Sequence, residues 1–278
     1  MLSFLTCVLA ADHELSHWRI EVNEENKGWR KNFIDAASRA KGDLIFFCDQ
    51  DDIWMEHKIQ VMSEAMEDEK IDVLAGKYIK FFDTDAEPPK DSPIENHGLH
   101  KVEIDNHILK TDLPGCVYCV RASFWKKIIK HWDGRFSHDG ISWAAAKLLG
   151  SLYILDMPVI YWRRHYDSAY TITSRDIKTN KNRVDWLEGH QCNVECLRRI
   201  LLEAEGFGEF AANEASGALD DLQEGMSRLN RYEKFNAIRI DMLTKHNPLK
   251  AFQLLEYMDC YDRKKQIILE TYLAVKRN

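Results

Sequence analysis

The sequence has no excess of positive charge, since 45 acidic residues outnumber 38 lysines and arginines and give a formal net charge of −7. Proteins that bind nucleic acid present a basic surface to the phosphates, so this composition argues against a nucleic-acid partner. No run approaches the ~20 consecutive apolar residues that a membrane-spanning helix needs. The apolar segment 1–11 lacks the basic residues that open a signal peptide, and we interpret it as part of the fold.

Paired cysteines are also lacking. The seven cysteines are odd in number and scattered along the 278 residues, which is typical of a reducing cytoplasm. Cys116 and Cys119 have the spacing of a zinc or redox pair, but side chains three apart in a strand point to opposite faces. His190, Cys192 and Cys196 could cluster on a helix, although a fourth ligand is not evident. The cysteines therefore favour a cytoplasmic protein without a structural zinc.

What the sequence does contain is an alternation of strands and helices, which predicts an α/β protein with a mixed, mostly parallel sheet and helices on both faces. The predicted strands cover 18–22, 44–48, 71–82, 116–120, 152–155 and 159–162, the last two on either side of Pro158. The predicted helices cover 29–42, 59–66, 124–132 and 143–149. The proline-containing segment 83–98 between them is expected to be a loop.

The character of the chain changes after about residue 174, where amphipathic helical patterns replace strands. We therefore expect a core over residues 1–174 and a helical extension over 175–278. Amphipathic helices in this extension could rest on a membrane surface, and core packing would explain their pattern equally well.

The most informative stretch is Phe46–Trp54, a buried strand end that leads into Asp49, Asp51 and Asp52. Three carboxylates within four positions repel one another and need a compensating cation if they are buried. Hard divalent cations such as Mn²⁺ or Mg²⁺ prefer carboxylate oxygens and often share them with a substrate's phosphates. A solvated acidic turn is the alternative, and the apolar residues on both sides argue against it.

Asn26, Gly28, Arg30 and Asn32 precede or open the helix before this strand. Free backbone amides at a helix start favour anions, and an arginine there could pair with phosphate. The alternative is that Asn26 and Gly28 simply form the turn.

Three blocks of residues together resemble glycosyltransferase family 2, and in particular its rhamnosyltransferase-like members. The first runs from Asn26-x-Gly28-x-Arg30-x-Asn32 to Asp49-Gln50-Asp51-Asp52-Ile53-Trp54, the second is Gly115–Arg121, and the third joins His138-Asp139 to Tyr161-Trp162-Arg163-Arg164-His165. The resemblance covers roughly residues 18–170. It implies a GT-A fold and an inverting transfer of sugar from a nucleotide-sugar donor to a hydroxyl of a polysaccharide or lipid-linked glycan.

The resemblance also implies roles for individual residues. Asp51, Asp49 and His165 would hold a divalent cation, Mn²⁺ or Mg²⁺. The donor would be bound by Asn26, Gly28, Arg30, Asn32, Asp49, Asp52 and Arg164. Gly115, Cys116 and Trp54 would lie on the acceptor side. Asp139 would be the base that removes the acceptor's proton, although an aspartate just before a helix is also a good N-cap.

One departure from the family pattern concerns the first strand–helix–strand unit, which usually holds the base of the nucleotide. Met1–Ser16 would correspond only to the end of that unit. This departure leaves a second hypothesis, that the protein is a non-catalytic relative with impaired donor binding which acts as a partner or a remnant.

Overall fold

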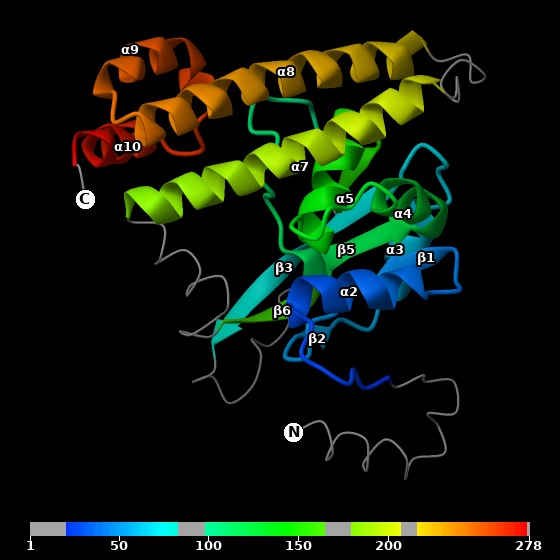
Figure 1. Ribbon diagram of the computed structural model, residues 1–278. Coiled ribbons are helices and arrows are strands. Elements are labelled where there is room, and N and C mark those ends of the chain that lie inside the picture. Colours follow the sequence, from blue (N-terminus) through cyan, green and yellow to red (C-terminus); the bar gives the residue numbers. More distant parts are fainter. Residues whose placement is uncertain (1–20, 83–97, 165–178, 207–215, 277–278) are drawn as a thin grey trace.

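The computed structural model describes residues 21–82, 98–164, 179–206 and 216–276. The chain folds into an α/β core and a set of long helices that lie across it (Figure 1). The strands are β1 (Leu44–Phe46), β2 (Ile53–Trp54), β3 (Val73–Phe82), β4 (Leu99–Lys101), β5 (Tyr118–Arg121) and β6 (Leu152–Arg164). The core helices are α2 (Gly28–Ser38), α3 (Lys58–Ala65), the 3₁₀ turn η2 (Gly115–Val117), α4 (Ala122–Ile129) and α5 (His138–Leu148).

The sheet is mixed, with strand order β1-β5-β3-β6-β2 and with β4 added to β6. The expected majority of parallel pairs is wrong for the described strands: β3 pairs with β6 in parallel, and the other neighbours are antiparallel. The reason is that the short strands β2, β4 and β5 return along the sheet instead of crossing over through a helix. Strands β1, β3 and β6 still run in one direction, so their carboxyl ends share one edge.

Strand β6 corrects a second prediction, because the two short strands expected around Pro158 form one strand from Leu152 to Arg164. Its register against β3 shifts at Gly76 and Lys77, where Lys77 pairs with Pro158. A bulge of this kind accommodates a proline that cannot donate to the ladder. Gly76 is required there, because a Cβ would lie 2.5 Å from Cγ2 of Val159.

The other predictions on the core differ mainly at their ends. The strand expected over 116–120 begins at Tyr118, and Cys116 lies in the preceding 3₁₀ turn. Residues 21 and 22 of the strand expected over 18–22 are not in a strand. The rest of that strand and the loop 83–97 lie outside the described residues.

The predicted helical extension is confirmed. It consists of α7 (Asn180–Gly206), α8 (Ser216–Thr244), η3 (Pro248–Lys250), α9 (Ala251–Leu254), η4 (Leu255–Cys260) and α10 (Lys265–Val275). Helices α7 and α8 pack against each other, and α5 of the core contacts both. The boundary predicted between residues 174 and 175 falls outside the described residues and stays a prediction.

Buried ionic contacts hold this extension together. Glu270 on α10 is fully buried, and its carboxylate accepts hydrogen bonds from Arg183 on α7, Arg239 on α8 and Tyr261. Burial alone would raise the pKa of Glu270, but Arg239 and Arg183 hold it below its usual value. We call Arg183, Arg239 and Glu270 the ionic cluster of the extension.

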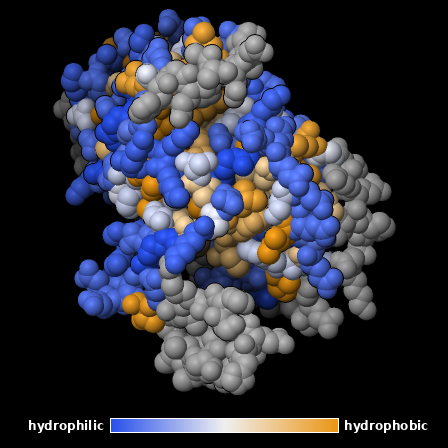
Figure 2. Space-filling view, turned by 90° about the vertical axis from the view of Figure 1, so that its right-hand side faces the viewer, coloured by the Kyte–Doolittle hydropathy of each residue, from blue (hydrophilic) through white to orange (hydrophobic). Residues whose placement is uncertain are grey.

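The surface is of ordinary character. On the face shown in Figure 2, hydrophilic residues cover most of the area and hydrophobic residues gather near its middle. Within the described part of the chain, no helix combines the length and the apolar character that crossing a membrane requires.

Candidate active site

The acidic turn 49–52 connects β1 to β2 at the edge where β1, β3 and β6 end. Ile45 and Phe47 are buried and anchor the strand before the turn, with Phe47 against the ring of Trp125 at 5.6 Å. After the turn, β2 pairs with β6 through Ile53–Tyr161 and Trp54–Ile160. The turn is therefore fixed to two strands of the sheet, which keeps its carboxylates in place.

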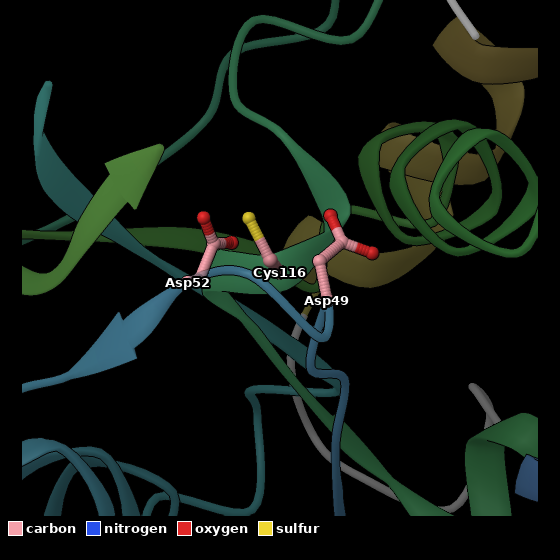
Figure 3. Close-up of side chains that lie close together, drawn as sticks. All are labelled: Asp49, Asp52 and Cys116. Carbon is pink, nitrogen blue, oxygen red and sulfur yellow. The ribbon is translucent and has the colours of Figure 1, made fainter. Parts of the chain in front are cut away.

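Two of the carboxylates share a small site with a thiol. One ligand atom from each of Asp49, Asp52 and Cys116 lies within 4.8 Å of the others. Figure 3 shows that Asp49 and Asp52 come from the turn after β1, that Cys116 comes from η2, and that the three side chains point to the same side. We call these three residues the acidic site. Within the described part of the chain this is the one group of ligand-type side chains close enough to hold a metal ion.

The fit of a divalent cation can be judged from the polar atoms of the acidic site. Oδ2 of Asp52 is buried and has no hydrogen-bond partner, which is unfavourable for a carboxylate oxygen unless something compensates it. Carboxylate oxygens suit Mn²⁺ and Mg²⁺, and a thiol is more compatible with Mn²⁺ than with Mg²⁺. The donor set therefore fits a divalent cation at Asp49 and Asp52.

The electrostatic surroundings of Asp49 also favour a bound cation. Burial, followed by the negative charges of Asp52, Asp51 and Asp139, raises the pKa of Asp49 to about 6, and Lys58 opposes the shift. Burial also raises the pKa of Asp52, although the backbone N–H of Arg163 donates to its Oδ1 at 3.0 Å. The site thus carries more negative charge than its surroundings neutralise.

Lys58 is the residue that sequence reasoning missed. It is fully buried on α3, donates from Nζ to the carbonyl oxygen of Cys116 at 2.8 Å and lies 3.9 Å from the centre of the Trp54 ring. Burial lowers the pKa of this lysine to about 8. A signal was present in the sequence, because Lys58 is four residues before Met62 and thus shares the apolar face of its helix.

Asp139 reaches the same region from the start of α5. A Cβ added at Gly115 would lie 2.8 Å from Cβ of Asp139 and 2.7 Å from Nε2 of His138, so the glycine lets η2 approach α5. The helix N-cap is Ser137, whose Oγ accepts from the N–H of Gly140 at 3.2 Å. The alternative N-cap role of Asp139 is therefore wrong, and its carboxylate stands in the first turn.

His138 closes this side of the site. Its ring stacks on Phe33 at 4.2 Å and lies 4.5 Å from Phe47. Burial lowers its pKa, which keeps the imidazole neutral, and its Nδ1 has no hydrogen-bond partner. Through Phe33, helix α2 is packed beside the first turn of α5.

The donor-binding residues predicted on and before α2 lie on the surface. Oδ1 of Asn26 accepts from the N–H of Gly28 at 2.9 Å, and Oδ1 of Asn32 accepts from Asn23 at 2.8 Å. Arg30 lies 4.6 Å from the centre of the Trp29 ring. None of these four residues belongs to the acidic site, and their donor-binding role stays a prediction.

At the end of β6, Arg163 contacts the acidic turn and lies next to Arg164, the predicted donor-binding residue. Arg163 binds the acidic turn twice, through its N–H to Asp52 and through Nε to the carbonyl oxygen of Asp51. Arg164 lies 4.4 Å from the Trp162 ring, and adjacent residues of a strand point to opposite faces. His165, the third predicted metal ligand, lies outside the described residues.

The remaining assignments can also be located. Asp51, a predicted metal ligand, is half-buried and is not part of the acidic site. The residues that join Asp49 there are Asp52 and Cys116. Trp54 is half-buried, with its Nε1 unpartnered beside Lys58. Neither Cys119 nor the set His190, Cys192 and Cys196 belongs to a metal-ligating group among the described residues. The roles of Asp51, Gly115 and Trp54 stay predictions.

Comparisons with known proteins agree with this arrangement. The sheet and its helices are similar to the crystal structure of S. aureus TarS 1–349 in complex with UDP-GlcNAc, with a TM-score of 0.51 and 16% identity over 98% of this chain and 74% of that one. A second TarS 1–349 structure, in complex with UDP, gives a TM-score of 0.45 and 14% identity over 97% and 77% of the two chains. The first of these two likenesses shows the fold, which is the α/β fold of GT-A type.

A further likeness is found at the level of the sequence. Residues 8–132 match the family described as glycosyl transferase family 2, and they include α2, the acidic turn and η2. This part of the chain is similar to family 2 glycosyltransferases, and the match indicates a transferase of glycosyl groups. No protein of the curated set matches the chain.

Proposed function

We propose that the protein transfers a sugar from a nucleotide-sugar donor to a hydroxyl of a polysaccharide or lipid-linked glycan, with inversion and with the help of Mn²⁺ or Mg²⁺. The observation that carries the proposal is the placement of Asp139 beside Gly115, next to an acidic site whose negative charge is not compensated. Free thiols at all six cysteines of the described ranges fit a reducing cytoplasm as the place of action.

In this reaction a nucleoside diphosphate leaves, so negative charge develops on its phosphates. Asp49 and Asp52 would hold the cation, which neutralises that charge when bound. Arg163 keeps Asp52 in position through its backbone N–H. Because Asp52 is already held in place, its carboxylate needs little reorganisation as the transition state forms.

Asp139 would act on the acceptor. As the acceptor hydroxyl attacks the sugar carbon from the face opposite the leaving diphosphate, the carboxylate of Asp139 takes the proton of that hydroxyl. The hydrogen bond from the N–H of Gly140 to Oδ1 of Asp139, at 2.8 Å, limits the orientation of the carboxylate. Gly115 and Cys116, on the adjacent turn, would line the acceptor side.

Binding of UDP with and without Mn²⁺, measured by calorimetry, tests the proposal. UDP is the first probe because the TarS structures contain UDP or UDP-GlcNAc. We expect Mn²⁺ to tighten UDP binding at least roughly tenfold, because the cation links carboxylates to phosphates. Asp49→Asn and Asp52→Asn should each remove that gain.

The matched control is Asp43→Asn, which changes an exposed acid just before β1 and should keep the Mn²⁺ effect. If Mn²⁺ does not affect the binding of UDP, GDP or dTDP to the unaltered chain, the metal-dependent proposal fails. If none of these nucleotides binds under any condition, the hypothesis of a non-catalytic relative replaces it.

A further inference from the structure

An apolar groove opens at the far end of the helical extension, between α9 with η4 on one side and α10 on the other. Figure 1 places α9 and α10 at the end of α8 that lies away from the strands. The groove has a volume of about 430 Å³. Its walls include Phe252, Leu255, Ile268, Tyr272 and Val275, and the acidic site uses none of these residues.

The outer face of α10 is apolar although it faces solvent. Ile268 is 70% exposed, Tyr272 is 53% exposed and Val275 is 62% exposed. Phe252, across the groove on α9, is 72% exposed. The inner face of α10 carries the buried Leu273 and Ala274. A helix that is apolar on both faces normally has a second apolar environment to cover it.

Cations stand at both ends of this outer face. Arg263, Lys264 and Lys265 lead into α10, and Lys276 follows it at 5.1 Å from the centre of the Tyr272 ring. Between Lys265 and Lys276 the one acid on the helix is Glu270, which is buried in the ionic cluster. Apolar side chains flanked by lysines match the boundary between lipid tails and anionic headgroups, where long basic side chains extend toward the headgroups.

We propose that this face, defined by Phe252, Leu255, Ile268, Tyr272 and Val275 with Lys264, Lys265 and Lys276 at its ends, docks the protein onto an anionic lipid bilayer. Two α10 helices packed against each other would bring lysines together in either orientation, which disfavours a second copy of the chain as the occupant. The exposed acids Glu256 and Asp262 and the net charge of −7 weaken the electrostatic attraction. Burial of the apolar side chains therefore has to add to the attraction of the lysines for the anionic headgroups.

The test is co-sedimentation of the full chain with lipid vesicles, using phosphatidylcholine alone or phosphatidylcholine mixed with phosphatidylglycerol. We expect binding to the mixed vesicles and much weaker binding to the neutral ones, with high salt reducing the difference. Replacing both Lys264 and Lys265 by Gln should lower the partition coefficient roughly 25-fold, because each cation near an anionic surface contributes about fivefold.

The apolar arm of the test uses Phe252→Ser with Ile268→Ser, which should reduce partitioning roughly tenfold or more on both kinds of vesicle. The matched control is Leu202→Ser with Leu219→Ser, which changes two side chains on α7 and α8 that are each 51% exposed. Because the substituted side chains are exposed, all variants should keep the helical circular dichroism and the unfolding midpoint of the original chain.

Vesicle binding that is lost in the groove variants and kept in the control supports the proposal. Absence of vesicle binding by the unaltered chain overturns it, and so does equal loss in the control. Light scattering in the absence of lipid tests whether a second copy of the chain covers the groove instead. That occupant would be shown if the unaltered chain is a dimer that does not bind vesicles, and if Phe252→Ser with Ile268→Ser converts the dimer to a monomer. None of these outcomes depends on catalysis, so they stand apart from the proposed transfer reaction.

Discussion

The acidic site of the core and the ionic cluster of the extension differ in whether their buried carboxylates have partners that neutralise the charge. In the ionic cluster two arginines and a tyrosine donate to Glu270, and the pKa of the carboxyl group lies below its usual value. In the acidic site burial and three neighbouring acids raise the pKa of Asp49 to about 6, and Oδ2 of Asp52 has no partner.

This difference separates a structural role from a functional one. A buried carboxylate whose hydrogen bonds are all made holds helices in register and has nothing left to offer a ligand. Carboxylates that raise one another's pKa retain free electron pairs and an unmet need for a cation, as in many ligand sites. The three predictions below test this contrast.

The largest expected effect is on turnover, from Asp139→Asn. The substitution keeps the shape of the side chain and removes the proton acceptor, so kcat should fall by about 10² to 10⁴. UDP binding with Mn²⁺ should change little, which distinguishes loss of the base from loss of the site. Transfer would be measured by release of nucleoside diphosphate from a panel of sugar nucleotides.

The control for Asp139 is Asp133→Asn, at an exposed position before α5, which should keep full turnover. Normal turnover in Asp139→Asn would assign the base to another group.

The next effect is on folding, from Glu270→Gln. An amide cannot balance Arg183 and Arg239, so two guanidinium groups would remain buried without their counter-ion, at a cost of about 3–5 kcal/mol in the free energy of unfolding. Urea unfolding followed by circular dichroism measures it. Glu224→Gln, which breaks the exposed pair with Arg228, should cost less than about 0.5 kcal/mol.

A small loss for Glu270→Gln, comparable with that of Glu224→Gln, would mean that the ionic cluster does not hold the extension together.

The smallest effect has the opposite sign and comes from Asp49→Asn. The pKa of Asp49 is about 6 in the folded chain against 3.8 ordinarily. Between these values the folded state keeps a proton that the unfolded state loses, so stability falls as pH rises toward 6 and the cost is complete above it. After allowance for solvent screening, the variant should be roughly 1 kcal/mol more stable than the original chain at neutral pH.

At a pH well below 3.8 the two proteins should have equal stability in urea unfolding, because Asp49 is then protonated in both states. Adding Mn²⁺ at neutral pH should stabilise the original chain and reduce the difference. An Asp49→Asn variant that is less stable at neutral pH would show that the acidic site is already compensated without a cation.

Several features of the active site follow from the sequence alone. The apolar run ending in Asp49, Asp51 and Asp52 already predicts a strand with a group of carboxylates at its end, since local burial and local charge are both written in neighbouring residues. The helical character of residues after 180 is likewise local, because a period of 3.6 residues in apolar side chains needs no partner to be recognised.

Tertiary structure alone decided which distant residues complete the site. Cys116, Lys58 and Arg163 reach the acidic site from η2, α3 and β6, and no spacing along the chain encodes these contacts. The directions of the strands were also beyond the sequence, because short apolar runs look the same in parallel and antiparallel sheets. Strand pairing depends on which strands meet in space. Whether a buried carboxylate is compensated, as in Glu270, or not, as in Asp49, likewise depends on which side chains the fold brings next to it.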